Sequence, residues 1–377
     1  MQKRTFIKAA LASAVSVMIV GCGKEEKAAQ TAAGAPAAPA AGNGPLKVAY
    51  IYVSPANEEG WSTQHDKARQ AIEKKFGDKI QVTWVENIPE NADAERVIRD
   101  LASQGNKLIF ATSFGYMNQL LKVAKEFPDT YFEHCTGYKT AANVTNYSAR
   151  FYEARYLAGL LAGAETKSNI IGYVAALPIP EVFQGINAFT RGVRAVNPKA
   201  EVRVVWTSSW YDPGKEADAT KSLIGQKADI ITHHTNSTAV ASTCEEAKVP
   251  VISYNSAMKK AAPTMLHAGV VHLWEEYYTN RIQMVLDGKW NNTPTWGGAQ
   301  EHMIDLEAIH AGAPAETVAK IKSTLEAMAK REFHPFTGPV VNNEGKEMIP
   351  AGRTATDEEL LSMNYFVEGV AGKAPTT

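Results

Sequence analysis

The sequence lacks several features that mark particular classes of protein. Lys and Arg total 39 and Asp and Glu total 40 among 377 residues, which gives a formal net charge of -1. Because a nucleic-acid-binding domain needs a basic patch or stripe, this balance argues against a nucleic-acid partner. The chain also has no Gly-x-Ser-x-Gly nucleophile elbow, no phosphate loop of the Gly-Lys-Ser/Thr type and no His-Glu-x-x-His zinc motif. We therefore expect a protein that is not an enzyme, with no catalytic residues and no cofactor.

Residues 1–22 have the pattern of a secretion signal. A basic start is followed by an apolar segment from Ala9 to Val20, which is too short to be a stable membrane span. The four residues from Ile19 to Cys22 look like a bacterial lipobox, in which a small residue precedes a Cys that becomes lipidated. We expect a lipoprotein signal peptide over 1–22 and a periplasmic protein anchored to the membrane of the bacterial cell envelope by a lipid on Cys22.

The next segment, residues 23–45, is expected to be a tether. From Ala28 to Pro45 it consists almost entirely of Ala, Pro and Gly without apolar periodicity, so it cannot bury a core. A lipid anchor followed by such a tether would hold a soluble body at a membrane surface.

Cysteine is scarce, with three residues in the whole chain. Once Cys22 is assigned to the anchor, Cys135 on an expected strand and Cys244 on an expected helix remain. A disulfide is permitted outside the cytoplasm, but these two residues fall in different halves of the body, which a bridge would lock together. We expect two buried free thiols.

The body begins with a strand, a loop and a helix. Residues 46–53 form an apolar run of strand length, Ser54 to Asn57 form a turn, and Ala68, Ile72 and Phe76 share one face of a helix over 63–76. Strands and helices then alternate, with further strands expected over 80–85, 107–111, 131–135, 143–149, 170–175, 202–207, 229–232 and 251–254. This alternation predicts an α/β protein with two doubly wound parallel sheets.

Several short motifs lie in order across nearly the whole body. They are Gly60-Trp61, 112–115 (TSFG), 171–174 (IGYV), 178–182 (PIPEV), 210–213 (WYDP), 336–339 (FTGP) and 363–370 (MNYFVEGV). With these motifs the chain resembles the basic membrane protein family, also called purine nucleoside receptor-like, whose members are substrate-binding lipoproteins of ABC importers. The resemblance implies a type I periplasmic binding protein fold, with two lobes joined by three crossings, and the transmembrane subunits of an ABC permease as partners.

The three crossings are expected near Arg150, Ala257 and Asn291. The first lobe would then comprise 46–149 and 258–290, and the second 150–257 and 291–377. The allocation of the last part, from Glu332 onwards, stays open.

Each lobe supplies one Trp after a strand, at the edge where open α/β sheets bind ligands. In nucleoside-binding relatives an aromatic pair sandwiches the base, so the resemblance implies that Trp61 and Trp210 do so here; each Trp packing its own lobe is the alternative. The other expected ligand-binding residues are Ser113, Phe114, Asp212, His234, Thr235, Asn236 and Asn255. His233-His234 is not expected to bind metal, because no Asp, Glu or Cys lies nearby at ligand spacing.

The ligand is expected to be a purine base, adenine first. Nucleoside-binding relatives have an acidic residue, suited to sugar hydroxyls, in the turn after the last strand of the second lobe, whereas residues 253–258 read Ser-Tyr-Asn-Ser-Ala-Met. A purine nucleoside and a sensory receptor role stay open. So does an extracytoplasmic nucleosidase, for which Asp212 and Glu181 are the candidate carboxylates.

Overall fold

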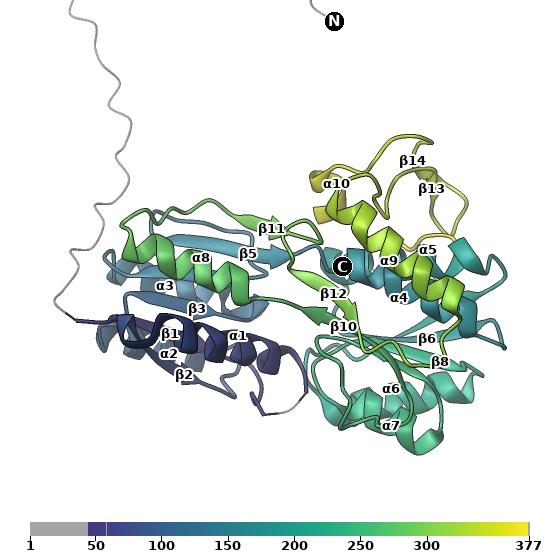
Figure 1. The fold of residues 1–377 in the computed structure, drawn as a ribbon, viewed down its shortest axis with the longest axis horizontal. Helices are drawn as coiled ribbons and strands as arrows, with labels where there is room; N and C mark the ends of the chain where they lie inside the picture. Colours follow the sequence, from purple (N-terminus) through teal and green to yellow (C-terminus); the bar gives the residue numbers. More distant parts are fainter. Residues whose placement is uncertain (1–43, 58, 376–377) are drawn as a thin grey trace, which may run out of the picture. The chain divides into compact units, whose positions relative to one another are not determined.

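A computed structural model describes residues 44–57 and 59–375 (Figure 1). The predicted signal peptide, the lipidation site Cys22 and nearly all of the predicted tether lie outside these residues and stay predictions. Within the described ranges no helix is both long and apolar enough to cross a membrane.

The first lobe is built on a six-stranded sheet in the order β11-β5-β4-β3-β1-β2, with every neighbouring pair parallel. Its strands are β1 (Leu46–Ile51), β2 (Ile80–Val85), β3 (Leu108–Ala111), β4 (Tyr131–Cys135), β5 (Val144–Ala149) and β11 (Thr295–Gly297). Val48 and Tyr50 pack into one apolar cluster, whereas Ala49 and Ile51 pack into another. Successive side chains on a strand point to opposite faces of the sheet. Residues 48–51 of β1 are all apolar because helices cover both faces of this sheet.

Four helices cover this first sheet. They are α1 (Trp61–Phe76), α2 (Ala92–Ser103), α3 (Met117–Glu126) and α8 (Glu275–Leu286). Helices α1 and α8 pack together, as do α2 and α3.

The second lobe has a seven-stranded sheet in the order β12-β10-β9-β8-β6-β7-β15. Its strands are β6 (Ile170–Ala175), β7 (Glu201–Trp206), β8 (Ile230–His234), β9 (Val251–Ser253), β10 (Leu266–His272), β12 (Ile304–Glu307) and β15 (Val370–Ala371). All pairs are parallel except β10 with β12. The predicted fold class, two mainly parallel sheets in an α/β protein, is confirmed.

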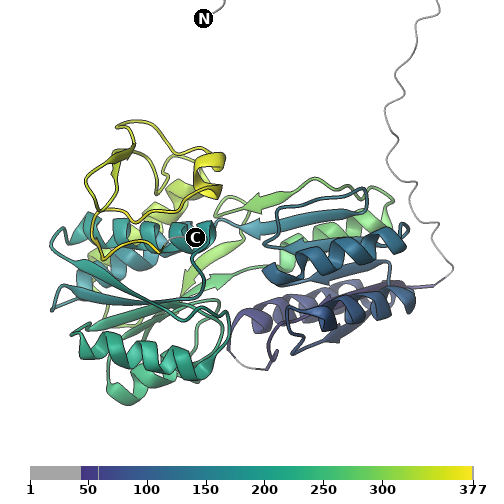
Figure 2. The ribbon, with the colours of Figure 1, turned by 180° about the vertical axis from the view of Figure 1, so that it is seen from behind.

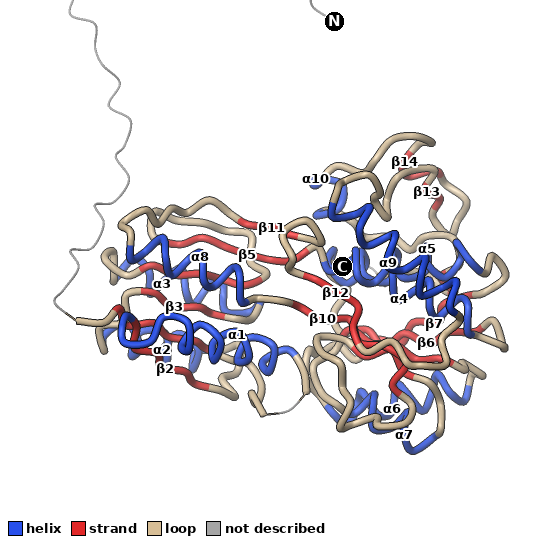
Figure 3. Tube along the Cα trace, viewed as in Figure 1, coloured by secondary structure: helices blue, strands red, loops and turns tan. Residues whose placement is uncertain are grey.

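Helices lie on both faces of the second sheet (Figure 3). They are α4 (Phe151–Glu165), α5 (Pro180–Val196) and α9 (Ala315–Ala329) on one face, and α6 (Pro213–Gly225) and α7 (Ala239–Ala247) on the other. Helices α4 and α5 pack so closely that a Cβ on Gly159 would lie 2.1 Å from the backbone oxygen of Phe189.

The lobe boundaries differ from the expectation at two crossings. The first crossing agrees, since β5 ends at Ala149 and α4 begins at Phe151. Strand β10, over 266–272, hydrogen-bonds to β9 of the second sheet, so the chain returns to the first lobe after His272 and not near Ala257. Strand β11, over 295–297, pairs with β5 of the first sheet, so the third crossing lies after Gly297 and not near Asn291. Sheet pairing, which the local pattern of residues does not reveal, sets both boundaries.

The C-terminal region belongs to the second lobe, as Figure 2 shows from behind. Its elements are β13 (Val340–Val341), which pairs with β14 (Glu347–Ile349), the short helix α10 (Asp357–Leu361), which contacts α5, and β15, which extends the second sheet beside β7. Cys135 and Cys244 are both buried and unbridged, as expected.

Candidate ligand-binding cleft

Loops that follow the carboxyl ends of parallel strands in both lobes meet around one small cavity. Seven of the nine expected ligand residues line it: Trp61, Ser113, Phe114, Trp210, His234, Asn236 and Asn255. The structure adds three residues, which are Thr136, Glu181 and Tyr254. The cavity therefore lies where open α/β sheets bind ligands.

The two lobes touch across this cavity. The Glu59 carboxylate of the first lobe accepts hydrogen bonds from the backbone N–H groups of Lys260 (2.8 Å) and Ala261 (3.1 Å) in the second. A Cβ on Gly60 would lie 2.5 Å from the backbone oxygen of Asn236. The enclosed volume is about 30 Å³, which suits about one water molecule. The two lobes are thus in contact, and the cavity between them is small in this structure.

Trp61 begins α1 and is buried, with 8% of its surface exposed. Its indole N–H donates to the backbone oxygen of Thr112 (2.6 Å). The ring makes edge-on contacts, with centroids 4.6–6.0 Å apart, to His65, Phe151, His272 and Trp274. Trp61 thus packs against His65 of its own lobe and against Phe151 and His272 of the second lobe, and it lines the cavity at the same time.

Trp210 is less buried than Trp61 and is held through its backbone. Its oxygen accepts from the N–H of Asn236 (2.8 Å), and its ring centroid lies 6.0 Å from that of His234. Its indole N–H is buried and has no partner among the described residues. The side chain is therefore placed by its neighbours and keeps a free donor.

Three further cavity residues also carry a buried polar atom that lacks a hydrogen-bond partner within the described chain: His234 Nδ1, the Tyr254 hydroxyl and Asn255 Oδ1. An unsatisfied buried polar group costs about 1–3 kcal/mol, and most such groups in proteins are paired. Unpaired buried polar atoms also occur elsewhere in the described chain, and those at this cavity could serve a ligand as donors and acceptors.

Asn255 shows how one of these free atoms is presented. Its amide nitrogen donates to the backbone oxygen of Thr235 and to Oδ1 of Asn236, both at 3.1 Å. Its backbone is left-handed, with φ of 70°, a conformation that Asn tolerates better than most residues. The amide orientation is thus fixed, and the oxygen is left as a free acceptor.

Glu181, in the first turn of α5, is a cavity residue that was considered from sequence only as a nucleosidase carboxylate. Its Oε1 lies 3.4 Å from Nε2 of His234. Burial raises the pKa of Glu181 to about 8, against an opposing effect of Arg155. Burial also holds the pKa of His234 well below its usual value. At neutral pH the pair is therefore mainly uncharged. The signal in the sequence was the position of Glu181 in the motif 178–182, which follows strand β6 within a few residues.

Two expected residues lie outside the cavity lining. Asp212 is the N-cap of α6, where its side chain accepts from the N–H of Lys215 (3.1 Å) and pairs with the Lys215 ammonium (3.2 Å). An Asp just before a helix commonly has this role. Thr235 is fully buried, and its hydroxyl lies 3.2 Å from Nδ1 of His233.

Ser113, and His233 beside the set, have internal partners. The Ser113 hydroxyl donates to Glu90 (2.6 Å), and Nε2 of His233 accepts from the N–H of Tyr254 (3.1 Å). His234 therefore lines the cavity while His233 supports the loop behind it, as the alternation of strand side chains predicts.

A larger hollow of about 670 Å³ borders the cavity and shares Phe114, Thr136 and Glu181 with it. Its other walls are mostly apolar and include the exposed side chains of Tyr138 and Leu361. The polar side chains of Asn146, Ser148, Gln184 and Thr295 also line it.

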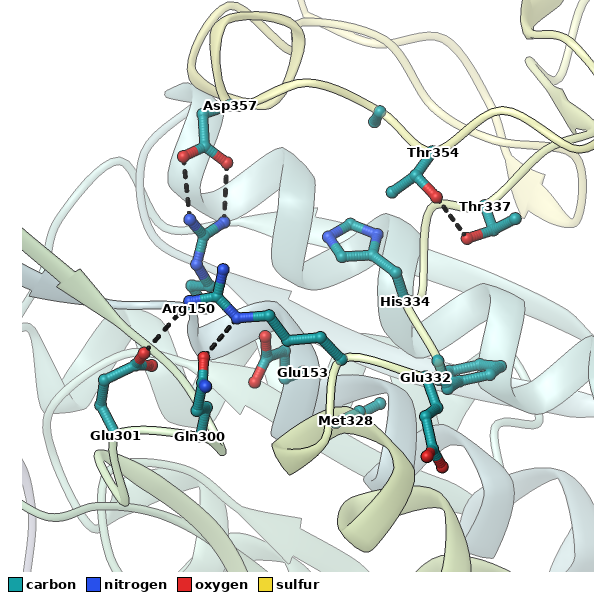
Figure 4. A pocket seen from close by; sticks show the side chains of 13 residues that line it. Arg150, Glu153, Gln300, Glu301, Met328, Glu332, His334, Thr337, Thr354 and Asp357 are labelled. Atoms are coloured by element: carbon teal, nitrogen blue, oxygen red, sulfur yellow. Dashed lines mark hydrogen bonds and ion pairs between the residues drawn. The ribbon is translucent and has the colours of Figure 1, made fainter.

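A third hollow, of about 320 Å³, lies beside the crossings and is lined by charged residues (Figure 4). The Arg150 guanidinium binds both oxygens of Asp357 at 2.8 Å, and Arg331 contacts Gln300 and Glu301. Glu153 and Glu332 line the hollow as well. We interpret the two ion pairs as contacts that stabilise the region of the crossings.

Comparison with known proteins decides the family. The family model described as ABC transporter substrate-binding protein PnrA-like matches residues 46–330. The chain belongs to this family. It is 47% identical to a purine-binding protein of Brucella abortus over 88% of this chain and 94% of that protein. It is 34% identical to a putative ABC transporter glucose-binding protein of Haloferax volcanii, over 88% of this chain and 82% of that protein.

Solved structures agree with the fold. A solute-binding protein of an Aeropyrum pernix ABC transporter system has a TM-score of 0.66 at 14% identity, covering 84% of this chain and 97% of that chain. One from Conexibacter woesei has a TM-score of 0.63 at 22% identity, covering 77% and 98%. The chain is thus a substrate-binding protein of an ABC transporter. Its family is one of extracytoplasmic substrate-binding proteins that bind small ligands and interact with the permease subunits of ABC transporters.

Proposed function

We propose that this protein binds a purine base, adenine first, between its two lobes and delivers it to an ABC permease. The observation that carries this proposal is the set of four unpaired buried polar atoms, on Trp210, His234, Tyr254 and Asn255, around a cavity with aromatic walls. The purine-binding relative supports the same ligand class. In this proposal the rings of Trp61 and Trp210 stack on opposite faces of the base, and each stacked face contributes about 1–3 kcal/mol.

The unpaired atoms suit the edge of adenine. Asn255 Oδ1 is an acceptor for the exocyclic amino group, and His234 Nδ1 faces the same cavity without a partner among the described residues. The Tyr254 hydroxyl can either donate or accept. Stacking alone would tolerate any base, so these hydrogen bonds set the selectivity.

A base is favoured over a nucleoside because the cavity has no carboxylate that stays ionised at neutral pH. Glu181 is the acidic residue of the lining, and burial raises its pKa to about 8. A protonated carboxyl group is a poor acceptor for two ribose hydroxyls. The protonated state of Glu181 also argues against a nucleosidase. The other candidate carboxylate, Asp212, caps a helix outside the cavity.

The ligand is tested by unfolding the purified protein and identifying the released small molecule by mass spectrometry. Adenine is expected, and release of a sugar or of a nucleoside alone would contradict the proposal. Incubation with adenosine followed by a search for free adenine tests the nucleosidase, and we expect none. We also propose that a lipid on Cys22 anchors the protein at the membrane.

A further inference from the structure

A second group of chemically reactive side chains lies in the second lobe, away from the cleft. Glu165 ends α4, His267 lies near the start of β10, and His310 follows β12. Strand β10 runs parallel to β9, whose carboxyl end leads into the cleft loop with Tyr254 and Asn255. His267 therefore lies toward the opposite edge of the sheet.

The three side chains converge closely. One carboxylate oxygen of Glu165 lies 2.6 Å from Nδ1 of His267, and the other lies 2.6 Å from Nε2 of His310. The two imidazole rings stack with centroids 3.9 Å apart at 24°. A backbone hydrogen bond from His310 N–H to the His267 oxygen (2.9 Å) holds the two segments together. The arrangement is thus fixed by the main chain of three elements.

Two imidazoles and one carboxylate are a known zinc ligand set, with bonds of about 2.0–2.2 Å and a fourth position for water. One possible ligand atom from each residue lies within 4.8 Å of the other two, so small side-chain rotations suffice to surround an ion. The side chains are between 11% and 26% exposed, which leaves a path from solvent. Their proximity satisfies the ligand-count and access requirements of a metal site.

We infer that Glu165, His267 and His310 form a binding site for a divalent transition-metal ion, zinc first. The ion takes the place of the two hydrogen bonds between the carboxylate and the imidazoles, and each neutral imidazole keeps one proton on its other ring nitrogen. It ties the end of α4 to β10 and to the loop after β12, and so stabilises the second lobe. The inference is independent of which ligand the cleft takes.

The test uses the purified protein without a polyhistidine tag, stripped with a chelator and titrated with Co²⁺ and then with Zn²⁺. We expect one Co²⁺ per chain with the visible absorption of a low-coordinate ion, displacement by Zn²⁺, and a rise in melting temperature with Zn²⁺ by mass action. His267→Ala and His310→Ala should each abolish the absorption. Circular dichroism and ligand binding in the cleft establish that these variants are folded.

His302→Asn is the matched control, because His302 is exposed in the same chain segment and lies outside the cluster. It should bind Co²⁺ as the unchanged protein does. Absence of the absorption in the unchanged protein, or its persistence in both folded His→Ala variants, would overturn the inference and leave the three residues as an ion-pair network only.

Discussion

A Cβ on Gly60 would lie 2.5 Å from the backbone oxygen of Asn236, a residue of the other lobe. Real Cβ atoms do not approach so closely, so the closed state requires glycine at this position. Because this oxygen belongs to backbone, it cannot move aside as a flexible side chain does. Gly60 therefore makes the close contact between the lobes and also directly precedes Trp61 in the chain.

The first prediction follows from this contact. Gly60→Ala should hold the lobes apart and weaken adenine binding by about tenfold or more, equivalent to about 1.4 kcal/mol of closure free energy. The free energy of unfolding should change little, because the clash exists only between lobes. Gly225→Ala is the control, since a Cβ there meets nothing within 4 Å.

Isothermal titration measures the affinity, and small-angle scattering measures compaction on adding adenine. Hinge closure around a ligand is a common motion of such proteins. Equal affinity and equal compaction in Gly60→Ala and the unchanged protein would show that this contact does not limit closure.

The second prediction separates the two Trp residues. Trp210→Ala should weaken adenine binding by roughly ten- to hundredfold through loss of a stacked face, with little loss of stability. Trp61→Ala should weaken binding similarly and also lower the free energy of unfolding by about 3–5 kcal/mol, because its ring packs in an aromatic cluster. Trp→Phe changes keep a ring and should cost less.

Tryptophan fluorescence and chemical denaturation supply both measurements. Adenine should quench the fluorescence of the unchanged protein. Unchanged affinity in the folded fraction of either Ala variant would mean that this Trp only packs its lobe.

The third prediction concerns pH. Burial raises the pKa of Glu181 to about 8 from a usual value of 4.5. The folded state therefore holds a proton that the unfolded state releases, and stability falls as pH rises from about 4.5 to about 8. Glu181→Gln has no group that titrates at this position, so the pH dependence due to Glu181 should vanish. The difference in the free energy of unfolding between the two proteins should therefore change between about pH 4.5 and about pH 8.

Urea denaturation between pH 4 and pH 9 tests it. Subtracting the variant's curve removes the contributions of other titrating groups, including Glu153, whose pKa burial raises to about 7. Parallel curves for the two proteins would contradict the raised pKa.

The fourth prediction concerns anchoring. Cys22→Ser should release the protein from membranes while leaving the body folded, because the anchor and the body are separated by the Ala- and Pro-rich segment. Fractionation of cells and a thermal melt of the soluble variant measure both. A Cys22→Ser protein that stays membrane-bound although its precursor is fully processed would show that the lipid is not the anchor.

The sequence predicted the fold class and most of the cavity lining for a simple reason. Ligand-facing residues follow strands, and strands such as 46–51 and 170–175 are readable as apolar runs. The positions of Trp61, Trp210 and Asn255 after strands therefore allowed the sequence to place them at the cavity, and the aromatic pairing of the two Trp residues came from the resemblance to the family. The motifs of the family placed these strands in order along the chain.

The rest could not be predicted because it depends on contacts between distant segments. Asp212 has the same local appearance as a ligand-binding acid, but it caps a helix. The raised pKa of Glu181 arises from burial, which no local pattern encodes. The lobe boundary after His272 depends on pairing of β10 with β9.

The central claim is that the cleft prefers a free purine base. Protein unfolded, dialysed free of ligand and refolded is titrated calorimetrically with adenine and, separately, with adenosine. We predict one adenine site per chain with a dissociation constant of about 1 μM or lower, and weaker binding of adenosine. Adenosine binding at least as tight as adenine, or no heat from adenine, would contradict the account.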